Sequence, residues 1–382
     1  MDDVVIVGAG PAGSVAATVL ARAGARVRIV DRSTFPRDKL CGDTVNPGTL
    51  ALLRRLGLSA CIDERGLPVD GMRLTGENGV TIDGRYPRGL TGRAIVRRDV
   101  DWSLLQRAIA SGARFEPSVS VRRPLMDERS GRRVVRGVEV ARKGGVEHPI
   151  YGRITVAADG RHSTVAFALG LARHPARPRR WAIGAYFENV AMPSSFGEMH
   201  VRAGRYVGVA AVPGGLTNVC LVRPSRPGDA PLGDPASLLA REIARDPMLR
   251  DRLAGARLAR PPVVLGPLAV DVDPCNIDGL LLAGDSAGFV DPITGDGLRF
   301  AVRGGELAAV AALEALEHGW PGVHARLAAR RRREFAGKWR FNRALRKVVG
   351  SPCALGAAAF GARFAPAAFE RIICIAGDCD LC

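Results

Sequence analysis

The chain has 382 residues, of which 47% are hydrophobic and 24% are charged, and its mean hydropathy is near zero. This composition excludes a disordered chain, a collagen-like fibre and a membrane bundle, and it favours a soluble protein of two or three domains. The formal net charge of +17 comes almost entirely from arginine, because only four of the 55 basic residues are lysine. Aromatic residues make up 5% of the chain and are not interleaved with the basic ones, so nucleic-acid binding is not expected.

The cysteine and hydropathy patterns bear on the compartment. Eight cysteines are too sparse for a disulfide scaffold, and no secretory signal precedes the first apolar run, so we expect a cytoplasmic protein. No stretch reaches about 18 uninterrupted apolar residues, which argues against a membrane-spanning helix. The Ala-rich tract at 353–376 is interrupted by charged residues and proline, and it is expected to form an amphipathic or buried helix.

The first residues predict a nucleotide-binding turn. Residues 4–7 are an apolar, β-branched run typical of a strand, and residues 14–23 have a helical pattern. Between them lies a G-x-G-x-x-G motif, from which we assign Gly8, Gly10, Pro11, Ala12 and Gly13 to cofactor binding. The first glycine permits a tight turn, the second lets a pyrophosphate approach the backbone, and the third lets the helix pack closely on the strand.

A carboxylate follows at the expected distance. A second predicted strand at 26–30 ends in Asp31, which lies 23 residues after Gly8, where an acidic residue holds ribose hydroxyls. We place Asp31 and its neighbour Arg32 at the adenosine end of a dinucleotide. A simple NAD domain would continue with alternating strands and helices, but residues 72–96 and 119–156 predict short strands with Gly-rich turns. This interruption argues against a plain NAD domain.

Two distant segments indicate FAD by resemblance. Residues 156–163 contain Asp159-Gly160, and residues 280–288 contain Gly284-Asp285. In this order they resemble the Asp-Gly and Gly-Asp motifs of flavoproteins built like para-hydroxybenzoate hydroxylase. The resemblance implies that Asp285 binds ribityl hydroxyls and that Asp159 and Gly160 lie near the pyrophosphate. Arg97 resembles the arginine that contacts the cofactor before a helix of the FAD domain; a surface arginine is the alternative.

The next segment bears on flavin chemistry. Pro292, Gly295, Asp296 and Gly297 precede a predicted helix at 298–316. The two glycines would let backbone N–H groups at the helix start approach the flavin pyrimidine, where they stabilise the negative charge of the reduced ring. We therefore assign all four residues to the cofactor, with Pro292 and Gly295 also assigned to catalysis. An ordinary turn proline is the alternative for Pro292.

A subfamily is indicated by two features. Residues 284–297, followed by residues 303–309, resemble the geranylgeranyl reductase family, and Lys39-Leu40-Cys41-Gly42-Asp43 resembles the Cys-Gly motif of those reductases. The resemblance implies that Cys41 lies beside the isoalloxazine, where it tunes the flavin or helps deliver a proton, and that Gly42 contacts the cofactor. A small buried thiol is the alternative for Cys41.

Two motifs of related enzymes are altered or missing. The Tyr-x-Trp-x-Phe-Pro strand of these reductases is replaced by 204–213, which keep Tyr206 and Pro213 without the Trp or Phe. Flavin halogenases require a lysine that meets hypohalous acid and a Trp-x-Trp-x-x-Pro motif, and the chain shows neither. Halogenation is therefore not expected. The altered strand weakens the assignment of a prenyl substrate more than it weakens the assignment of FAD as the cofactor.

The middle of the chain is expected to hold the substrate. Residues 180–190, 197–201, 206–212 and 218–222 predict an antiparallel sheet over the flavin. Candidate lining groups, each also a candidate for the core, are Trp181, Tyr186, Phe187, Phe196, Met199, His200 and Tyr206. The predicted fold is α/β: a Rossmann-type FAD-binding domain of the glutathione-reductase-like kind, an antiparallel-sheet substrate domain and a C-terminal helical segment. The expected boundaries are 1–70, 94–175 and 270–320 for the FAD domain, 71–93 and 176–269 for the substrate domain, and 321–382 for the helical segment.

The C-terminal segment is basic. Residues 326–347 contain ten Lys or Arg and one acid, with aromatic residues at near-helical spacing. Such a helix either rests on the anionic inner face of a membrane or presents a solvated cationic face with its aromatic side in the core. Cys374, Cys379 and Cys382, with Cys353 upstream, are expected to be thiols, and no metal site is expected.

The sequence leaves two reaction classes open. In the first, reduced FAD passes hydride to a C=C bond of an isoprenoid or other hydrophobic substrate, prenyl or lipid, with NAD(P)H or another reductant as electron donor. In the second, a monooxygenase hydroxylates or epoxidises an aromatic or polyketide-like substrate through a flavin hydroperoxide. Both use one dinucleotide fold, so the fold does not discriminate between them. A non-catalytic electron relay is the third class.

Overall fold

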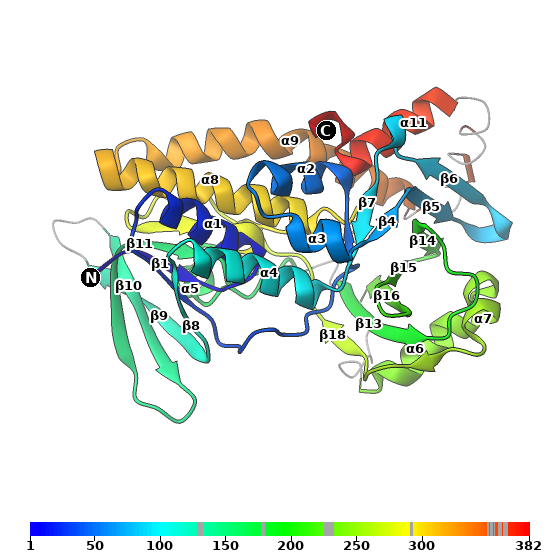
Figure 1. The fold of residues 1–382 in the computed structure, drawn as a ribbon, viewed down its shortest axis with the longest axis horizontal. Helices are drawn as coiled ribbons and strands as arrows, with labels where there is room; N and C mark the ends of the chain where they lie inside the picture. The colour runs from blue at the N-terminus through cyan, green and yellow to red at the C-terminus, as the bar shows by residue number, and fades with distance from the viewer. Residues whose placement is uncertain are drawn as a thin grey trace.

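A computed structural model describes residues 1–127, 133–176, 180–224, 233–290, 293–349, 351, 354, 356, 357, 361 and 366–382. The predictions for Pro292 and Cys353 lie outside these residues. Figure 1 shows a strand-rich region at each end of the view, with α8 and α9 running together along one edge. The predicted α/β class is confirmed.

The first sheet carries the nucleotide-binding turn. Its strand order is β8 (Arg114–Glu116), β2 (Val27–Val30), β1 (Asp2–Val7), β11 (His148–Ala157), β10 (Val134–Arg142) and β9 (Val119–Asp127), with β20 (Leu280–Leu282) also paired with β11. Strands β8, β2, β1, β11 and β20 are parallel, whereas β9, β10 and the first part of β11 form an antiparallel meander. The predicted strands at 4–7 and 26–30 and the short strands at 119–156 are confirmed.

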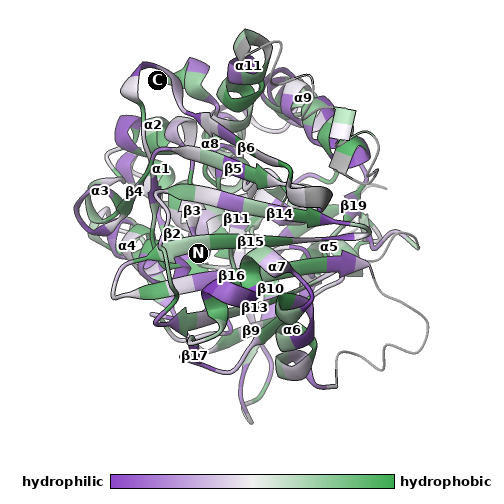
Figure 2. Cartoon of the chain, turned by 90° about the vertical axis from the view of Figure 1, so that its right-hand side faces the viewer, coloured by the Kyte–Doolittle hydropathy of each residue, from purple (hydrophilic) through white to green (hydrophobic). Residues whose placement is uncertain are grey.

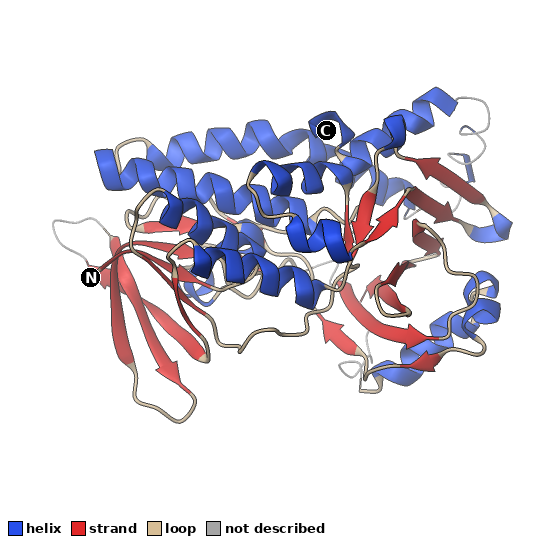
Figure 3. Ribbon diagram, viewed as in Figure 1, coloured by secondary structure: helices blue, strands red, loops and turns tan. Residues whose placement is uncertain are grey.

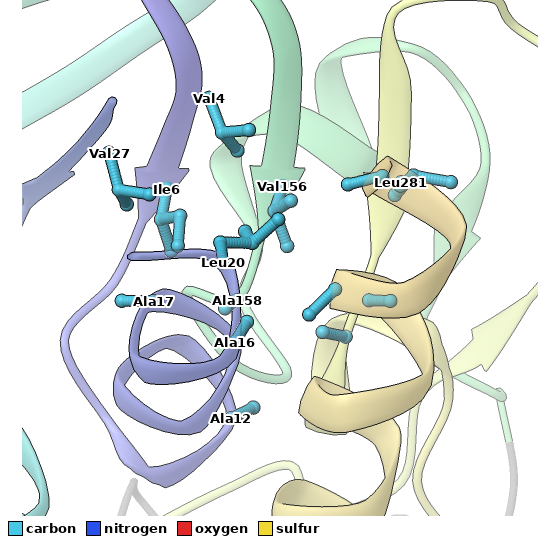
Figure 4. Close-up of a cluster of buried hydrophobic side chains, with 14 of the residues drawn as sticks. Val4, Ile6, Ala12, Ala16, Ala17, Leu20, Val27, Val156, Ala158 and Leu281 are labelled. Carbon is cyan, nitrogen blue, oxygen red and sulfur yellow. The ribbon is translucent and has the colours of Figure 1, made fainter. Parts of the chain in front are cut away.

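Helices pack on this sheet, and the hydrophobic core lies between the helices and the strands. They are α1 (Pro11–Arg22), α4 (Arg97–Ala110) and α8 (Gly297–His318), with α9 (Val323–Val349) packed on α8. Figure 4 shows Val4, Ile6 and Val156 of the strands facing Ala16 and Leu20 of α1. The α1–α8 approach requires small residues, since a Cβ at Gly305 would lie 2.3 Å from the Ala12 carbonyl oxygen.

The second sheet contains the strands predicted for the middle of the chain. Its order is β17 (Arg257–Leu258), β13 (Arg180–Glu188), β16 (Leu216–Pro224), β15 (Arg205–Val212), β14 (Phe196–Arg202), β5 (Gly71–Thr75) and β6 (Thr81–Arg85), with β18 (Val263–Leu265) also paired with β13. The pairing is antiparallel as predicted, except that β14 and β5 are parallel. That exception arises because β5 arrives from the N-terminal part of the chain and not through a hairpin with β14.

The two faces of this sheet have different neighbours. Odd-numbered residues of β13, β15 and β16 pack under α6 (Pro235–Ala244) and α7 (Pro247–Leu253). Even-numbered residues pack with Leu40, Ile293 and Leu345, which belong to the segments expected to surround the flavin and to α9. Figure 2 turns this end of the molecule toward the viewer and shows the strands side by side in the order given above.

Smaller elements join the two sheets. Strands β3 (Thr44–Val45), β7 (Gly92–Ala94) and β4 (Leu67–Val69) form a three-stranded sheet beside α2 (Pro47–Arg55) and α3 (Ala60–Arg65). Helix α5 (Thr164–Ala168) follows the Asp-Gly segment, and β12 (Ala172–Arg173) pairs with β19 (Asp271–Val272). Near the C-terminus, α11 (Pro366–Gly377) packs on β5 and β6. Figure 3 distinguishes these helices and strands by colour.

Candidate flavin site

The glycine-rich turn has the shape that a pyrophosphate requires. Gly8 has a φ of +99°, and a Cβ at Gly13 would lie 1.9 Å from the Gly8 carbonyl oxygen, so both positions need glycine. The backbone N–H of Ala9 donates to Asp31 Oδ2 at 2.8 Å, and that of Ser33 donates to Asp31 Oδ1 at 2.8 Å. Asp31 therefore ties the turn to the end of β2. Helix α1 then begins at Pro11 with first-turn N–H groups available to an anion.

The Asp-Gly and Gly-Asp segments meet beside this turn. Ser286 Oγ accepts a hydrogen bond from the Gly160 N–H at 2.8 Å and lies 3.2 Å from Asp159 Oδ1. The other oxygen of Asp159 accepts from the Thr164 N–H at 2.8 Å. Asp159 thus holds the loops together, and its burial raises its pKa. The two motifs are brought together as the resemblance implies.

Asp285 presents a half-buried carboxylate at the same place. Within the described part of the chain no hydrogen bond or ion pair engages this carboxylate, so it is available to hydroxyl groups. Arg161 and Lys39 are its charged neighbours. The Nε of Arg161 is buried and has no hydrogen-bond partner among the described residues. Burial and the neighbouring Arg97 guanidinium lower the pKa of Lys39 to about 8.

The segment that contains Cys41 lies between the two sheets. Arg97 Nη1 lies 3.8 Å from Cys41 Sγ, and Arg97 Nε pairs with Asp101 Oδ1 at 2.5 Å. Leu40 packs against Gly184 of β13, where a Cβ would lie 1.9 Å from Leu40 Cδ1. Cys41 and Arg97, predicted from separate motifs, are therefore in contact at the junction of the two sheets. Gly42, next in the chain, is exposed.

The loop before α8 lies beside this segment. Gly295 has a φ of +69°, and a Cβ at Gly295 would lie 3.6 Å from Thr44 Oγ1. Helix α8 begins at Gly297, one residue before the predicted start at 298. The Asp296 carboxylate points away into a buried cluster, where Lys338 Nζ lies 3.0 Å from its Oδ1 and Asn342 Nδ2 donates to its Oδ2 at 3.2 Å. Any contact between Asp296 and a cofactor would therefore come from its backbone.

A carboxylate that the sequence analysis did not assign, Asp43, lies between Arg97 and the second sheet. Asp43 is buried, and its Oδ2 accepts hydrogen bonds at 2.5 Å from both the Tyr186 hydroxyl and Asn218 Nδ2. Its Oδ1 accepts from the Arg97 N–H at 3.0 Å. Burial raises the pKa of Asp43 to about 6, although these hydrogen bonds oppose the rise. The available signal was a carboxylate directly after the Cys-Gly pair.

Several expected contacts have other environments. Tyr186 and Tyr206 lie on the even-numbered face of the sheet, but Phe187 packs under α6 and α7 because of its odd position in β13. His200 is fully buried between Thr75 Oγ1 at 2.8 Å and Glu198 Oε2 at 3.1 Å. Phe187 and His200 therefore occupy packed positions, which is the core alternative that the sequence left open for them. Arg32 is exposed and has no hydrogen bond or ion pair among the described residues.

These features fit FAD. Four features lie along one edge of the parallel sheet, at the carboxyl ends of its strands: the glycine turn, the Asp31 carboxylate, the Asp285 carboxylate and Arg161 Nε, of which the last two have no hydrogen-bond partner among the described residues. Parallel sheets bind ligands at this edge. The residues that would hold the cofactor are thus gathered from β1, β2, β11 and β20.

Comparison with known proteins identifies the family. The sequence profile of the FAD binding domain matches residues 1–224. Digeranylgeranylglycerophospholipid reductase 2 of Methanopyrus kandleri is 31% identical over 322 residues, with 82% of this chain and 78% of that protein covered. The chain belongs to the geranylgeranyl reductase family of FAD-binding proteins.

Other relatives of this reductase-family chain are named for other substrates or other roles. Menaquinone reductase of Mycobacterium tuberculosis is 30% identical, with 80% of this chain and 75% of that protein covered. Conditioned medium factor receptor 1 of Dictyostelium discoideum is 29% identical over 343 residues; 82% of this chain is covered, and the chain spans 63% of that protein's length.

Solved structures share the fold. A flavin-dependent brominase has a TM-score of 0.86 at 20% identity, covering 99% of this chain and 94% of that one. The myxobacterial chondrochloren halogenase has a TM-score of 0.80 at 24% identity, covering 90% and 82%. At these identities the likeness is one of fold. The reductase-family chain is accordingly an FAD-dependent oxidoreductase. Its described helices include none that is long and apolar enough to cross a bilayer.

Proposed function

We propose that the protein reduces C=C bonds of an isoprenoid or other hydrophobic substrate by hydride transfer from reduced FAD. The observation that carries this proposal is the position of Cys41. Its Sγ lies against Arg97, and its carbonyl oxygen accepts a hydrogen bond from Asn218 Nδ2 at 2.8 Å, so the reductase-like segment lies between the FAD-binding side and the second sheet. Relatives named for reducing digeranylgeranylglycerophospholipid and geranylgeranyl diphosphate support the substrate class.

The described residues fit a site in which the flavin supplies the redox chemistry. Arg97, held by Asp101, places a guanidinium beside Cys41. The start of α8 and the Gly295 turn supply backbone N–H groups and a helix dipole near the same segment, which favour negative charge there. Gly208 and Ala210 are small residues on the same face of the second sheet as Asn218 and Tyr186. NAD(P)H or another reductant would supply the electrons.

The test is anaerobic. The enzyme-bound flavin is reduced, geranylgeranyl diphosphate or a geranylgeranylated glycerophospholipid is added, and flavin reoxidation is followed together with product mass. We expect reoxidation in step with a gain of two hydrogens per reduced bond. A saturated analogue is the matched control and should leave the flavin reduced. Reduced flavin that persists with each prenyl substrate until air is admitted would contradict the proposal.

A monooxygenase is the second candidate. Squalene epoxidase 3 of Arabidopsis thaliana is 25% identical over 318 residues, with 78% of this chain and 58% of that protein covered. If the chain is a monooxygenase, product forms only when oxygen is admitted and gains one oxygen atom. An electron relay would reoxidise with a protein acceptor and leave both kinds of small substrate unchanged.

A further inference from the structure

The buried carboxylate of Asp43 has no role in the site as described so far. The residue follows Cys41 and Gly42 in the chain, and its φ of +55° turns its side chain under the second sheet. Its three hydrogen-bond donors come from three elements: Tyr186 of β13, Asn218 of β16 and the N–H of Arg97 at the start of α4. A carboxylate gathered in this way links the FAD-binding side to the sheet above it.

The sheet register fixes two of these donors. Tyr186 and Asn218 are directly opposite each other in the β13–β16 pair and lie on the even-numbered face. The Asn218 amide spans Asp43 Oδ2 and the Cys41 carbonyl oxygen, at 2.5 and 2.8 Å, so it uses both of its N–H groups. Tyr186 is half-buried and donates to the same Asp43 oxygen. The three residues form one connected network next to Cys41.

Reduction of a double bond consumes a proton as well as a hydride. We propose that Asp43 holds this proton and passes it through the Tyr186 hydroxyl, a role that rests on the proposed function. When Asp43 is protonated, its O–H donates to the Tyr186 oxygen, which reverses the bond to the ionised carboxylate and frees the Tyr186 hydroxyl hydrogen. In the step, one alkene carbon would receive the hydride that bound reduced FAD supplies, and the Tyr186 O–H bond breaks as a C–H bond forms at the other carbon. The Asp43 proton moves to the Tyr186 oxygen, and the resulting carboxylate takes a new proton from solvent. The alkene gains two hydrogens, and the flavin is oxidised.

The surroundings favour a neutral Asp43 at mildly acidic pH. The titratable and charged groups that face it are Tyr186, Cys220, Cys41 and Arg97. Burial raises the pKa of Tyr186 and raises that of Cys220 to about 12, so both remain neutral beside the carboxyl group. Arg97 is the one cation among these four, and its guanidinium is paired with Asp101. Burial therefore outweighs the charge of Arg97 at Asp43, whose pKa rises to about 6.

Asp43→Asn and Tyr186→Phe test the proposal without substrate. An aspartate whose pKa is raised in the folded state adds stability below its unfolded pKa, and that contribution is lost as pH rises through about 6. We expect the melting temperature of Asp43→Asn, relative to wild type, to rise between pH 4 and pH 7. Asparagine tolerates a positive φ, so this variant suits the backbone. Tyr186→Phe removes a hydrogen-bond donor to the Asp43 carboxylate, which should raise the pKa of Asp43 further. The pH at which the melting temperature changes should therefore move upward.

Asp83→Asn is the matched control. Asp83 pairs with Arg73 on the second sheet, and that hydrogen bond lowers its pKa, so its pH effect on stability should have the opposite sign. Parallel pH dependences of melting in wild type and Asp43→Asn would overturn the proposal.

Turnover supplies the second measurement. The wild-type rate of anaerobic prenyl reduction should fall as pH rises through about 6. Asp43→Asn should lose this dependence and be at least roughly 100-fold slower at pH 5, with flavin content unchanged. Tyr186→Phe should show a similar loss of rate. A variant profile that matches wild type overturns the role of Asp43 but leaves the reductase assignment standing. Formation of reduced product by the wild-type protein is measured first, before the variants are compared. If the wild-type protein makes no reduced product, the proposed reductase function is overturned instead.

Discussion

Ser286 and Gly160 are 126 residues apart in the chain, yet the Gly160 N–H donates to Ser286 Oγ at 2.8 Å. This bond fastens the turn after β11 to the turn after β20, the two parallel strands that continue the sheet beyond β1. Because both turns are fixed within the protein, Asp285 and Arg161 are already positioned before a cofactor binds. Preorganisation of this kind lowers the ordering cost of binding.

Asp285→Ala should lose FAD affinity. Its carboxylate is free to accept hydroxyl hydrogen bonds, and hydrogen bonds to a charged group contribute about 1.5 to 3 kcal/mol each. We expect binding to weaken by roughly 10- to 100-fold, measured by flavin fluorescence titration of the apoprotein. Asp273→Ala, at an exposed carboxylate paired with Arg173, is the control and should bind FAD normally. Unchanged affinity in Asp285→Ala would mean that the ribityl site is elsewhere.

Cys41→Ser should retain FAD and slow turnover. The thiol lies 3.8 Å from Arg97 Nη1 at the junction of the two sheets, and serine preserves its size with a different acidity and polarisability. Flavin content and stopped-flow reoxidation by the prenyl substrate measure the two effects separately. Cys61→Ser, at another half-buried thiol, is the comparison. A Cys41→Ser variant that works at full speed would make the thiol an ordinary packing residue.

Lys338→Met should destabilise the C-terminal segment. Lys338 Nζ lies 3.0 Å from both Asp296 Oδ1 and Asp378 Oδ2 and donates to the carbonyl oxygens of Ile375 and Ala376. Removal of the cation leaves the buried Asp296 carboxylate without its ion-pair partner, whereas Asp378 keeps Arg299 at 3.2 Å, and breaking a buried pair in this way costs about 3 to 5 kcal/mol. The melting temperature should fall by several degrees in a thermal denaturation scan. Arg340→Met, on the exposed side of the same helix, should change it little.

Helix α9 should bind anionic vesicles. Phe335 is 1% exposed and packs with Phe300 and Trp339, so the aromatic side of the helix faces the core and a membrane contact would depend on the basic face alone. Arg332, Arg333, Arg340 and Arg343 are exposed and form no ion pairs with described residues. Such a face attracts acidic headgroups at about 1 kcal/mol per basic residue.

The vesicle experiment varies the charge of the lipid and, separately, the charge of the exposed face of α9. We expect cosedimentation with phosphatidylserine-containing vesicles at low salt and none with phosphatidylcholine alone. A variant with Arg332, Arg340 and Arg343 changed to Glu should stay in the supernatant with melting unchanged. Equal binding by this variant and wild type would assign the contact to another surface.

The sequence by itself determined the nucleotide-binding half of the protein. Gly8 and Gly13 are required by the local turn between β1 and α1, and Asp31 ends the next strand, so short-range patterns were enough to place them. The predicted strands of the second sheet also agree with the structure, because alternation along a strand is a local property. Resemblance then connected the Asp159 and Asp285 segments to the same site.

Only the tertiary structure decided the environment of each buried polar side chain. Asp43 meets Tyr186 and Asn218 across separations of 143 and 175 residues, and these contacts depend on the order and register of β13 and β16. A shift of one residue in that register would turn Tyr186 to the other face, where Phe187 packs under α6 and α7. Local sequence patterns carry no information on such pairings, because burial and hydrogen bonding arise when distant strands come together.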